Sequence, residues 1–318
     1  MYFLPCSRIR RPLSRLYPVA MQTLPGPVQA GTQAAGNKTS PPIVVSIAGF
    51  DPSSGAGFTA DLKVFAAHGL YGLACPTALT VQSTQGVRRS EGVQAELVAE
   101  TLACLADDFP IAGIKIGMLA DGPVLLAVAR WLAGYRRQVP ALPVVLDPVL
   151  RSSSGTELLS PEAVALLGSE LLPLISVLTP NLDEAAQLSG LPVNTRDAAE
   201  RAASALLRHM SLPNSAVVVT GGHLGADQAP DDFLLDGATG TWFSGPRVHT
   251  RATHGTGCAF SSALLCNLVK GLPLPAAVSA AKTYVRAALQ AAYPLGHGRG
   301  PMHHLFALDS TRTPTSED

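Results

Sequence analysis

The sequence has little charge and no excess of either sign. Charged residues make up only 14% of its 318 positions, and 23 basic side chains balance 23 acidic ones. Without a net positive charge, there is no electrostatic basis for binding nucleic acid or an anionic membrane surface. No apolar run approaches the ~20 residues that a membrane-spanning helix needs. We therefore expect no nucleic acid and no membrane among the partners of this protein.

Cysteine is scarce as well, and its five copies form no CxxC pair. An odd number of cysteines without paired spacing argues against a disulfide framework and against a zinc site. The five are Cys6, Cys75, Cys104, Cys258 and Cys266. Reduced thiols are typical of the cytosol, so we expect a cytoplasmic protein.

Acidic residues are missing from the start of the chain, where the first is Asp51. An arginine-rich leader without acidic residues can be an organellar transit peptide, although its prolines weaken an amphipathic helix. We favour a disordered extension over residues 1–40, with Met21 as an alternative start. We also expect a disordered tail at residues 309–318, which leaves one domain over residues 41–308.

Within that domain, short β-branched runs alternate with longer helical patterns. The expected strands cover residues 43–48, 73–81, 111–116, 144–146, 175–178 and 216–220. The expected helices lie near residues 57–68, 93–107, 122–137, 161–172, 181–190, 196–210, 256–270 and 275–292, with hairpin or edge elements at 87–91 and 233–243. Such alternation predicts a mainly parallel sheet covered by helices on both faces.

A glycine-rich turn at residues 253–258 (THGTGC) opens the expected helix over residues 256–270. The first N–H groups of a helix have no acceptor within it and lie at the positive end of its dipole, so they favour an anion. Cys258 falls in the first turn, where we expect the pKa of its thiol to be lowered. A glycine-rich cap followed by a buried cysteine is an equally good interpretation of this stretch alone.

A second glycine-rich turn lies at residues 48–57 (AGFDPSSGAG), between an expected strand and an expected helix. That order places the turn at the carboxyl end of a parallel sheet, where open α/β folds bind their ligands. The turn lacks the Lys-Ser/Thr of a Walker phosphate loop, and it does not match a dinucleotide fingerprint.

Polar residues follow three further strands. Asp147 precedes a proline, a combination that also starts ordinary turns. Asn181 and Glu184 are three positions apart at a helix start, which suits a hydrated Mg²⁺ at Glu184 or a capping arrangement. Thr220 and Gly222 belong to a turn (TGGH) that fits a nucleotide groove or an exposed loop.

Together with the segment 77–84 (TALTVQST), these turns resemble the hydroxymethylpyrimidine and phosphomethylpyrimidine kinases of thiamin biosynthesis. The resemblance covers nearly all of residues 43–304, including the closing segment 295–304 (LGHGRGPMHH). It implies the ribokinase-like fold, a three-layer αβα sandwich with a mainly parallel central sheet. It also implies a small-molecule substrate, ATP, Mg²⁺ and a homodimer.

By the family pattern, the residues that line the pyrimidine pocket are Gly49, Asp61, Gln82, Met118 and Val149. A glutamine amide both donates and accepts hydrogen bonds, which suits the edge of an aminopyrimidine. Nucleotide binding is implied for Asn181, Thr220 and Gly222, and Mg²⁺ binding for Asp147 and Glu184. Without the resemblance, Gln82 fits an ordinary strand-end amide, Asp61 a surface carboxylate and Met118 a core residue.

For catalysis, the resemblance implies that Cys258 is the general base, where most ribokinase relatives use an aspartate. Cys258 would accept the proton of the substrate's hydroxymethyl group as its oxygen attacks the γ-phosphate of ATP. The residues whose N–H groups would bind the developing negative charge are Gly255, Thr256, Gly257 and Cys258.

The sequence departs from the family pattern at three positions. Ser153 and Thr220 stand where relatives usually carry lysines, and Phe50 replaces a common serine and should narrow the first loop. Two missing positive charges near the phosphates should weaken nucleotide binding or the second phosphorylation, in which the acceptor is already anionic. Arg151 is a candidate to compensate for one of them.

The leading expectation is phosphorylation of 4-amino-5-hydroxymethyl-2-methylpyrimidine and of its monophosphate, and two other functions stay open. The first is a pyridoxal or pyridoxine kinase, against which Gln82 argues because relatives directed at vitamin B6 tend to carry a different residue there. The second is a pyrimidine-binding protein without catalysis. The missing lysines would suit this function, but the intact 254–258 motif argues against it.

Overall fold

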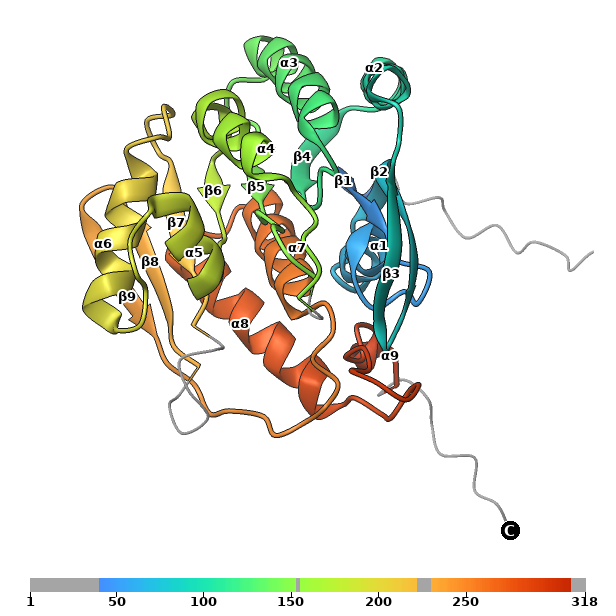
Figure 1. Ribbon diagram of the computed structural model, residues 1–318, viewed down its shortest axis with the longest axis vertical. Coiled ribbons are helices and arrows are strands. Elements are labelled where there is room, and N and C mark those ends of the chain that lie inside the picture. Colours follow the sequence, from blue (N-terminus) through green and yellow to red (C-terminus); the bar gives the residue numbers. More distant parts are fainter. Residues whose placement is uncertain (1–39, 153–154, 222–229, 310–318) are drawn as a thin grey trace, which may run out of the picture. The chain divides into compact units, whose positions relative to one another are not determined.

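The computed structural model describes residues 40–152, 155–221 and 230–309. Its strands form a nine-stranded sheet in the order β3-β2-β1-β4-β5-β6-β7-β8-β9 (Figure 1). The strands are β1 (Ile43–Phe50), β2 (Tyr71–Ser83), β3 (Gly86–Gly92), β4 (Ile111–Ile116), β5 (Val144–Leu146), β6 (Val177–Leu178), β7 (Ala216–Val219), β8 (Asp232–Asp236) and β9 (Thr239–Phe243). Strands β2, β1, β4, β5, β6 and β7 run parallel, whereas β3, β8 and β9 are antiparallel to their neighbours. The mainly parallel sheet predicted from the sequence is confirmed.

Helices cover both faces of this sheet (Figure 1). They are α1 (Gly57–Ala67), α2 (Ala95–Asp108), α3 (Gly122–Gln138), α4 (Pro161–Leu166), α5 (Leu182–Ser189), α6 (Arg196–Leu207), α7 (Thr256–Val269), α8 (Leu274–Gln290) and α9 (Phe306–Asp309). Helices α2 to α6 contribute to the core on one face, and α1, α7 and α8 to the core on the other. In the part of the chain that the structure describes, no helix has both the length and the apolar character needed to cross a membrane.

The central strands supply both cores through their period of two residues. In β1, Val45 and Ile47 belong to the core under α2 to α6, while Val44 between them belongs to the core under α1, α7 and α8. In β5, Leu146 and Val145 divide between the two cores in the same way. Strands buried on both faces are apolar without alternation, which is why these runs were recognisable from the sequence.

The segment predicted as one helix over residues 161–172 is divided. Helix α4 ends at Leu166, a π-turn η1 (Leu167–Leu171) follows, and a 3₁₀ turn η2 (Leu172–Leu174) completes the segment. Pro173 has no N–H to donate, so an α-helix cannot continue through it.

The ends of β1, β5, β6 and β7 open at the carboxyl edge of the sheet, next to the start of α7. Residues from Pro41 onward form one compact unit. The expected extension over residues 1–40 and the expected tail over residues 309–318 lie almost entirely outside the described residues, so the disorder predicted for them stays a prediction.

Candidate active site

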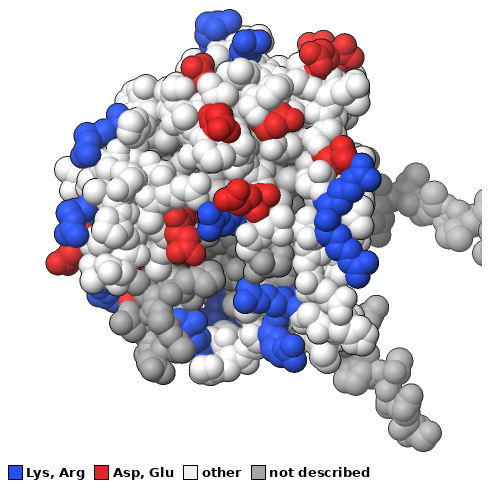
Figure 2. Space-filling model, viewed as in Figure 1, with Lys and Arg blue, Asp and Glu red and all other residues white. Residues whose placement is uncertain are grey.

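A cavity of about 1540 Å³ opens at the carboxyl ends of the parallel strands. The ends of β1 and β2, the turns after β5 and β7, and the starts of α5 and α7 contribute to its walls. The face of the molecule drawn in Figure 2 is hollowed near its centre, with basic side chains along the lower rim of the hollow. The two glycine-rich turns found in the sequence therefore meet around one space.

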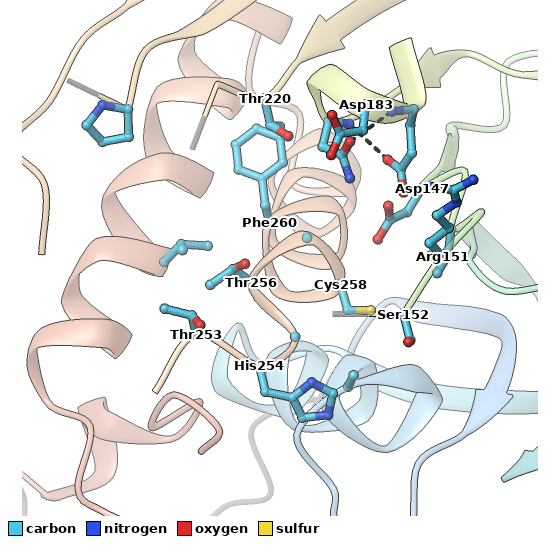
Figure 3. A pocket seen from close by; sticks show the side chains of 18 of the residues that line it. Asp147, Arg151, Ser152, Asp183, Thr220, Thr253, His254, Thr256, Cys258 and Phe260 are labelled. Carbon is cyan, nitrogen blue, oxygen red and sulfur yellow. Dashed lines mark hydrogen bonds between the residues drawn. The ribbon is translucent and has the colours of Figure 1, made fainter. Parts of the chain in front are cut away.

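Helix α7 begins at Thr256, and the residue before it, Gly255, has a φ of +80°. A Cβ atom on Gly255 would lie 1.9 Å from the carbonyl oxygen of Gly55, so the two turns can touch only because residue 255 is glycine. Thr256, Gly257 and Cys258 in the first turn of α7 line the cavity (Figure 3). The positive end of the helix thus faces the cavity, which is the arrangement expected of an anion site.

Cys258 is half-buried in the wall of this cavity. Burial raises the pKa of its thiol to about 12, although the positive charge of Lys115 and a hydrogen bond from the Gly57 N–H act in the opposite direction. The lowered pKa expected from the helix start is therefore wrong. Loss of solvation outweighs the helix N-terminus here, and Cys258 is a neutral thiol near pH 7.

Asp51, whose role the sequence analysis missed, organises the turn after β1. Its carboxylate accepts hydrogen bonds from the N–H groups of Ser53, Gly55 and Ala56 and from the Ser53 hydroxyl. The fifth donor is His254 Nε2, 2.7 Å from Asp51 Oδ2. Burial would raise the pKa of Asp51, but the hydrogen bonds from His254 and Ser53 lower it to about 2. An ionised Asp51 therefore ties the first turn to the start of the second.

Four residues that the resemblance assigned to a pyrimidine pocket, Gly49, Gln82, Met118 and Val149, line the cavity, and pyrimidine binding by them stays a prediction. A Cβ atom on Gly49 would lie 2.9 Å from Met118 Sδ, so glycine leaves room for this methionine. Gln82 approaches two neighbours, Thr80 Oγ1 at 3.1 Å and His254 Nε2 at 3.2 Å. These side chains place a polar amide beside apolar walls, as a flat heteroaromatic ring requires.

Asp61 is the exception, because it does not line the cavity. It is fully buried in α1 and accepts hydrogen bonds from Ser46 Oγ at 2.6 Å, Lys115 Nζ at 3.0 Å and Ser262 Oγ at 2.8 Å. Both expectations for it, a pocket-lining group and a surface carboxylate, are wrong. Its counter-ion Lys115 lines the cavity instead, so Asp61 lies one layer beneath the site.

Two carboxylates, Asp147 and Glu184, also line the cavity. Burial raises the pKa of both, and the negative charge of Asp147 adds to the effect on Glu184, whose pKa rises to about 8. Glu184 also forms the capping box of α5: Asn181 N donates to Glu184 Oε2 at 2.9 Å, and Glu184 N donates to Asn181 Oδ1 at 2.9 Å. The capping arrangement weighed from the sequence is thus present.

Among the expected nucleotide-binding residues, Asn181 and Thr220 line the cavity. They are held side by side by a hydrogen bond from Thr220 N to the carbonyl oxygen of Pro180 at 2.8 Å. Gly222 and Ser153 lie outside the described residues, so the expectations placed on them stay predictions.

Basic side chains to which the sequence analysis assigned no role also line the cavity. They are Lys115, Arg247, Lys282, Arg286 and Arg299. Lys282 lies 2.7 Å from Asp232 Oδ2, and Arg151 on the rim pairs with Glu157 at 3.2 Å. The cavity therefore carries positive charge although two lysines of the family pattern are missing. Lys282 and Arg286, four positions apart on one helix face, were a signal that the sequence analysis passed over.

Several known proteins are similar to this chain. The hydroxymethylpyrimidine/phosphomethylpyrimidine kinase of Rhizobium meliloti is 44% identical over 266 residues, which cover 82% of this chain and 96% of the relative. The enzyme of the same name from Escherichia coli is 42% identical and covers 83% of this chain and 97% of the relative.

Solved structures agree on the fold. A pyridoxal kinase of Bacillus subtilis in complex with ADP superposes with a TM-score of 0.75 at 31% identity, covering 85% of this chain and 99% of that one. A phosphomethylpyrimidine kinase of Clostridium difficile superposes with a TM-score of 0.67 at 32% identity, covering 78% and 99%. The ribokinase-like three-layer αβα fold implied by the resemblance is confirmed.

The family model described as phosphomethylpyrimidine kinase matches residues 51–303. This span contains the turn of Asp51, the strand of Gln82 and the helix start of Cys258. The chain therefore belongs to the phosphomethylpyrimidine kinase family.

Proposed function

We propose that this protein transfers the γ-phosphoryl group of ATP to 4-amino-5-hydroxymethyl-2-methylpyrimidine, and then to the resulting monophosphate to give the diphosphate. The observation that carries the proposal is that Gln82 and the first turn of α7 line one cavity. Relatives that are 44% and 42% identical are named as kinases of these two compounds, which supports the same substrates here.

In this proposal the pyrimidine binds against Gln82, with Met118 and Val149 as apolar walls. The phosphates of ATP lie against the N–H groups of Gly255, Thr256 and Gly257, three residues that line the cavity at the start of α7. Phosphoryl transfer depends mainly on positioning and on donors aimed at the developing charge, so a preformed helix start supplies most of what the reaction needs.

Cys258 is the proposed proton acceptor for the hydroxymethyl oxygen. Because burial keeps its thiol neutral, only the small thiolate fraction can accept that proton. The group that favours the thiolate is the buried Lys115 ammonium, whose positive charge lowers the pKa of Cys258. Activity that depends on Cys258 should therefore increase with pH through the neutral range.

Asp147 and Glu184 fit a divalent cation. Both are buried carboxylates with raised pKa values, and each costs less to ionise beside a cation. Within residues 40–152, 155–221 and 230–309, no cluster of three or more His, Cys, Asp or Glu side chains is suited to a metal. Two carboxylates with several waters suit Mg²⁺, which would neutralise charge on the phosphates when bound.

The experiment that tests the substrate is an ADP-release assay with Mg²⁺-ATP. The hydroxymethylpyrimidine, its monophosphate and pyridoxal are offered separately, because the superposed pyridoxal kinase shares the fold. Turnover of both pyrimidine compounds supports the proposal. Turnover of pyridoxal alone would show that the protein is a pyridoxal kinase. Binding of the pyrimidine without ADP release would show that it is a pyrimidine-binding protein without catalysis.

The second phosphorylation is tested through Thr220, which lines the cavity where relatives usually carry a lysine. Thr220→Lys restores one positive charge and should raise kcat/KM for the monophosphate more than for the uncharged alcohol, by roughly tenfold for one charge-assisted hydrogen bond. Equal effects on both acceptors would show that this position does not limit the second step.

We also propose that the protein is cytoplasmic and forms a homodimer. The first rests on the reduced cysteines, four of which are free in the structure, and the second on the family resemblance. Size-exclusion chromatography with light scattering measures the mass of the particle, and a monomer at micromolar concentration would contradict the dimer.

A further inference from the structure

The side-chain amide of Gln82 lies between two polar groups. Its Nε2 is 3.2 Å from His254 Nε2, and its Oε1 is 3.1 Å from Thr80 Oγ1. A half-turn of the amide exchanges its nearly equal oxygen and nitrogen atoms, so the hydrogens of the neighbours decide which way it points.

The hydrogen on His254 is fixed by Asp51. His254 Nε2 lies 2.7 Å from Asp51 Oδ2, an oxygen that already accepts from the N–H groups of Gly55 and Ala56. A carboxylate saturated with donors acts only as an acceptor, so His254 Nε2 must carry a hydrogen whether the ring is neutral or charged. A protonated ring nitrogen cannot accept a hydrogen bond from the NH₂ group of Gln82.

The hydrogen on Thr80 is fixed by Phe50. Thr80 Oγ1 lies 2.8 Å from the carbonyl oxygen of Phe50, which can only accept. The hydroxyl group has one hydrogen, and this shorter contact takes it. The remaining lone pairs of Thr80 Oγ1 then require a donor from Gln82.

We infer that the Gln82 amide is held with its oxygen toward His254 and its nitrogen toward Thr80, and that these two neighbours are positioning residues for substrate selection. The inference rests on the proposed function, in which Gln82 contacts the pyrimidine. His254 Nε2 has one hydrogen and Asp51 takes it, so both lone pairs of Oε1 and one hydrogen of Nε2 remain for the ligand. The acceptor lies on the His254 side, and the donor lies on the Thr80 side.

An amide with a fixed orientation distinguishes a ligand whose donor and acceptor are in one order from a ligand with the reverse order. An amide that can rotate would bind both equally well. A ring with an amino group beside an unprotonated ring nitrogen offers one donor and one acceptor. The 4-oxo analogue, with a protonated ring nitrogen, offers the same pair in the reverse order. Against a fixed Gln82, the wrong order sets donor against donor and acceptor against acceptor, and unpaired groups in a desolvated site weaken binding strongly. His254 and Thr80 thereby select the amino compound.

Calorimetric titration of 4-amino-5-hydroxymethyl-2-methylpyrimidine and of its 4-oxo analogue tests this selection. The readout is the ratio of the two Kd values. If Thr80 had only a structural role, its loss would weaken the binding of both compounds equally and leave this ratio unchanged. Thr80→Val removes the hydroxyl that fixes the amide, so the ratio should fall roughly tenfold, the equivalent of about one hydrogen bond. Thr80→Ser keeps the hydroxyl and should keep the ratio.

Thr59→Val is the matched control, because Thr59 Oγ1 lies 3.1 Å from Asp51 O and 3.0 Å from Ala56 O in the same turn, and its hydrogen is shared between these two carbonyl oxygens. It should leave the ratio unchanged, and Thr80→Ala provides a second removal of the hydroxyl if the valine variant does not fold. Tight binding of the amino compound with an unchanged ratio in both Thr80 variants would overturn this inference alone. If the wild-type protein binds neither compound, the proposed function and this inference both fail.

Discussion

Asp61 in α1 and Lys115 in β4 form an ion pair of 3.0 Å in which both side chains are fully buried. Ser46 and Ser262 donate two further hydrogen bonds to the carboxylate, so every contact of Asp61 holds it beneath the cavity. The pair joins a helix, two neighbouring strands and α7, and both of its charges act on the pKa of the Cys258 thiol. It supports the site without lining it.

Asp61→Asn should destabilise the protein strongly, because it leaves the Lys115 ammonium buried without a counter-ion. Breaking one side of a buried pair costs about 3–5 kcal/mol in the free energy of unfolding. Urea unfolding followed by circular dichroism measures it. Glu157→Gln, which breaks the exposed pair with Arg151, is the control and should change little. Equal effects of the two variants would contradict the role given to Asp61.

Gly255→Ala should lower both the free energy of unfolding and the turnover far more than Gly134→Ala does. The φ of +80° is unfavourable for alanine, and its Cβ would lie 1.9 Å from Gly55 O, so we expect a loss of at least about 2 kcal/mol and of ATP-dependent turnover. Gly134 in α3 is the control, because its Cβ would meet nothing closer than 3.8 Å. Gly134→Ala should stabilise the helix by about 0.5–1 kcal/mol. A neutral Gly255→Ala would show that the two turns need not touch.

The thiol of Cys258 should react slowly with iodoacetamide at neutral pH. Burial raises its pKa to about 12, so its thiolate fraction is small and should increase about tenfold for each pH unit. Mass spectrometry of the alkylated peptides compares it with Cys104, which is exposed. Faster alkylation of Cys258 than of Cys104 near neutral pH would mean that the helix start lowers its pKa after all.

His304 should make the fold sensitive to acid. Burial and the positive charge of Lys63 lower the pKa of His304 from 6.5 to about 4, so the unfolded chain binds its proton at a higher pH than the folded protein does. Its contribution to stability is complete above pH 6.5 and is lost as the pH falls from 6.5 to 4.

Unfolding experiments at about pH 7 and about pH 4.5 should therefore differ by about 2–3 kcal/mol more in the wild-type protein than in His304→Gln. His209→Gln, at an exposed position, is the control and should keep the wild-type difference. If His304→Gln also keeps the wild-type difference, protonation of His304 is not the cause of the lower stability in acid.

The strands and the two glycine-rich turns could be predicted because their signals are local. The strand over Ile43–Ala48 was predicted from its apolar residues and the turn after it from the spacing of its glycines. The structure extends that strand to Phe50. The helix start at Thr256 followed from the turn before it in the same way. Parallel strands then bring such turns to one edge of the sheet, which made a shared site predictable.

The errors concern groups whose environment comes from distant parts of the chain. Asp61 pairs with Lys115, 54 positions away, and His254 meets Asp51, 203 positions away, so no local pattern revealed either contact. The pKa of Cys258 was misjudged for the same reason. The rule for helix starts is local, but burial depends on how α7 packs against the sheet.

Turnover of Cys258→Ala with the hydroxymethylpyrimidine and Mg²⁺-ATP tests whether Cys258 accepts the substrate proton in this cavity. Loss of a positioned base should lower kcat by about 10²–10⁴ with little change in KM, while Cys104→Ala at an exposed position should match the wild-type protein. A Cys258→Ala variant that keeps the wild-type kcat would contradict the claim.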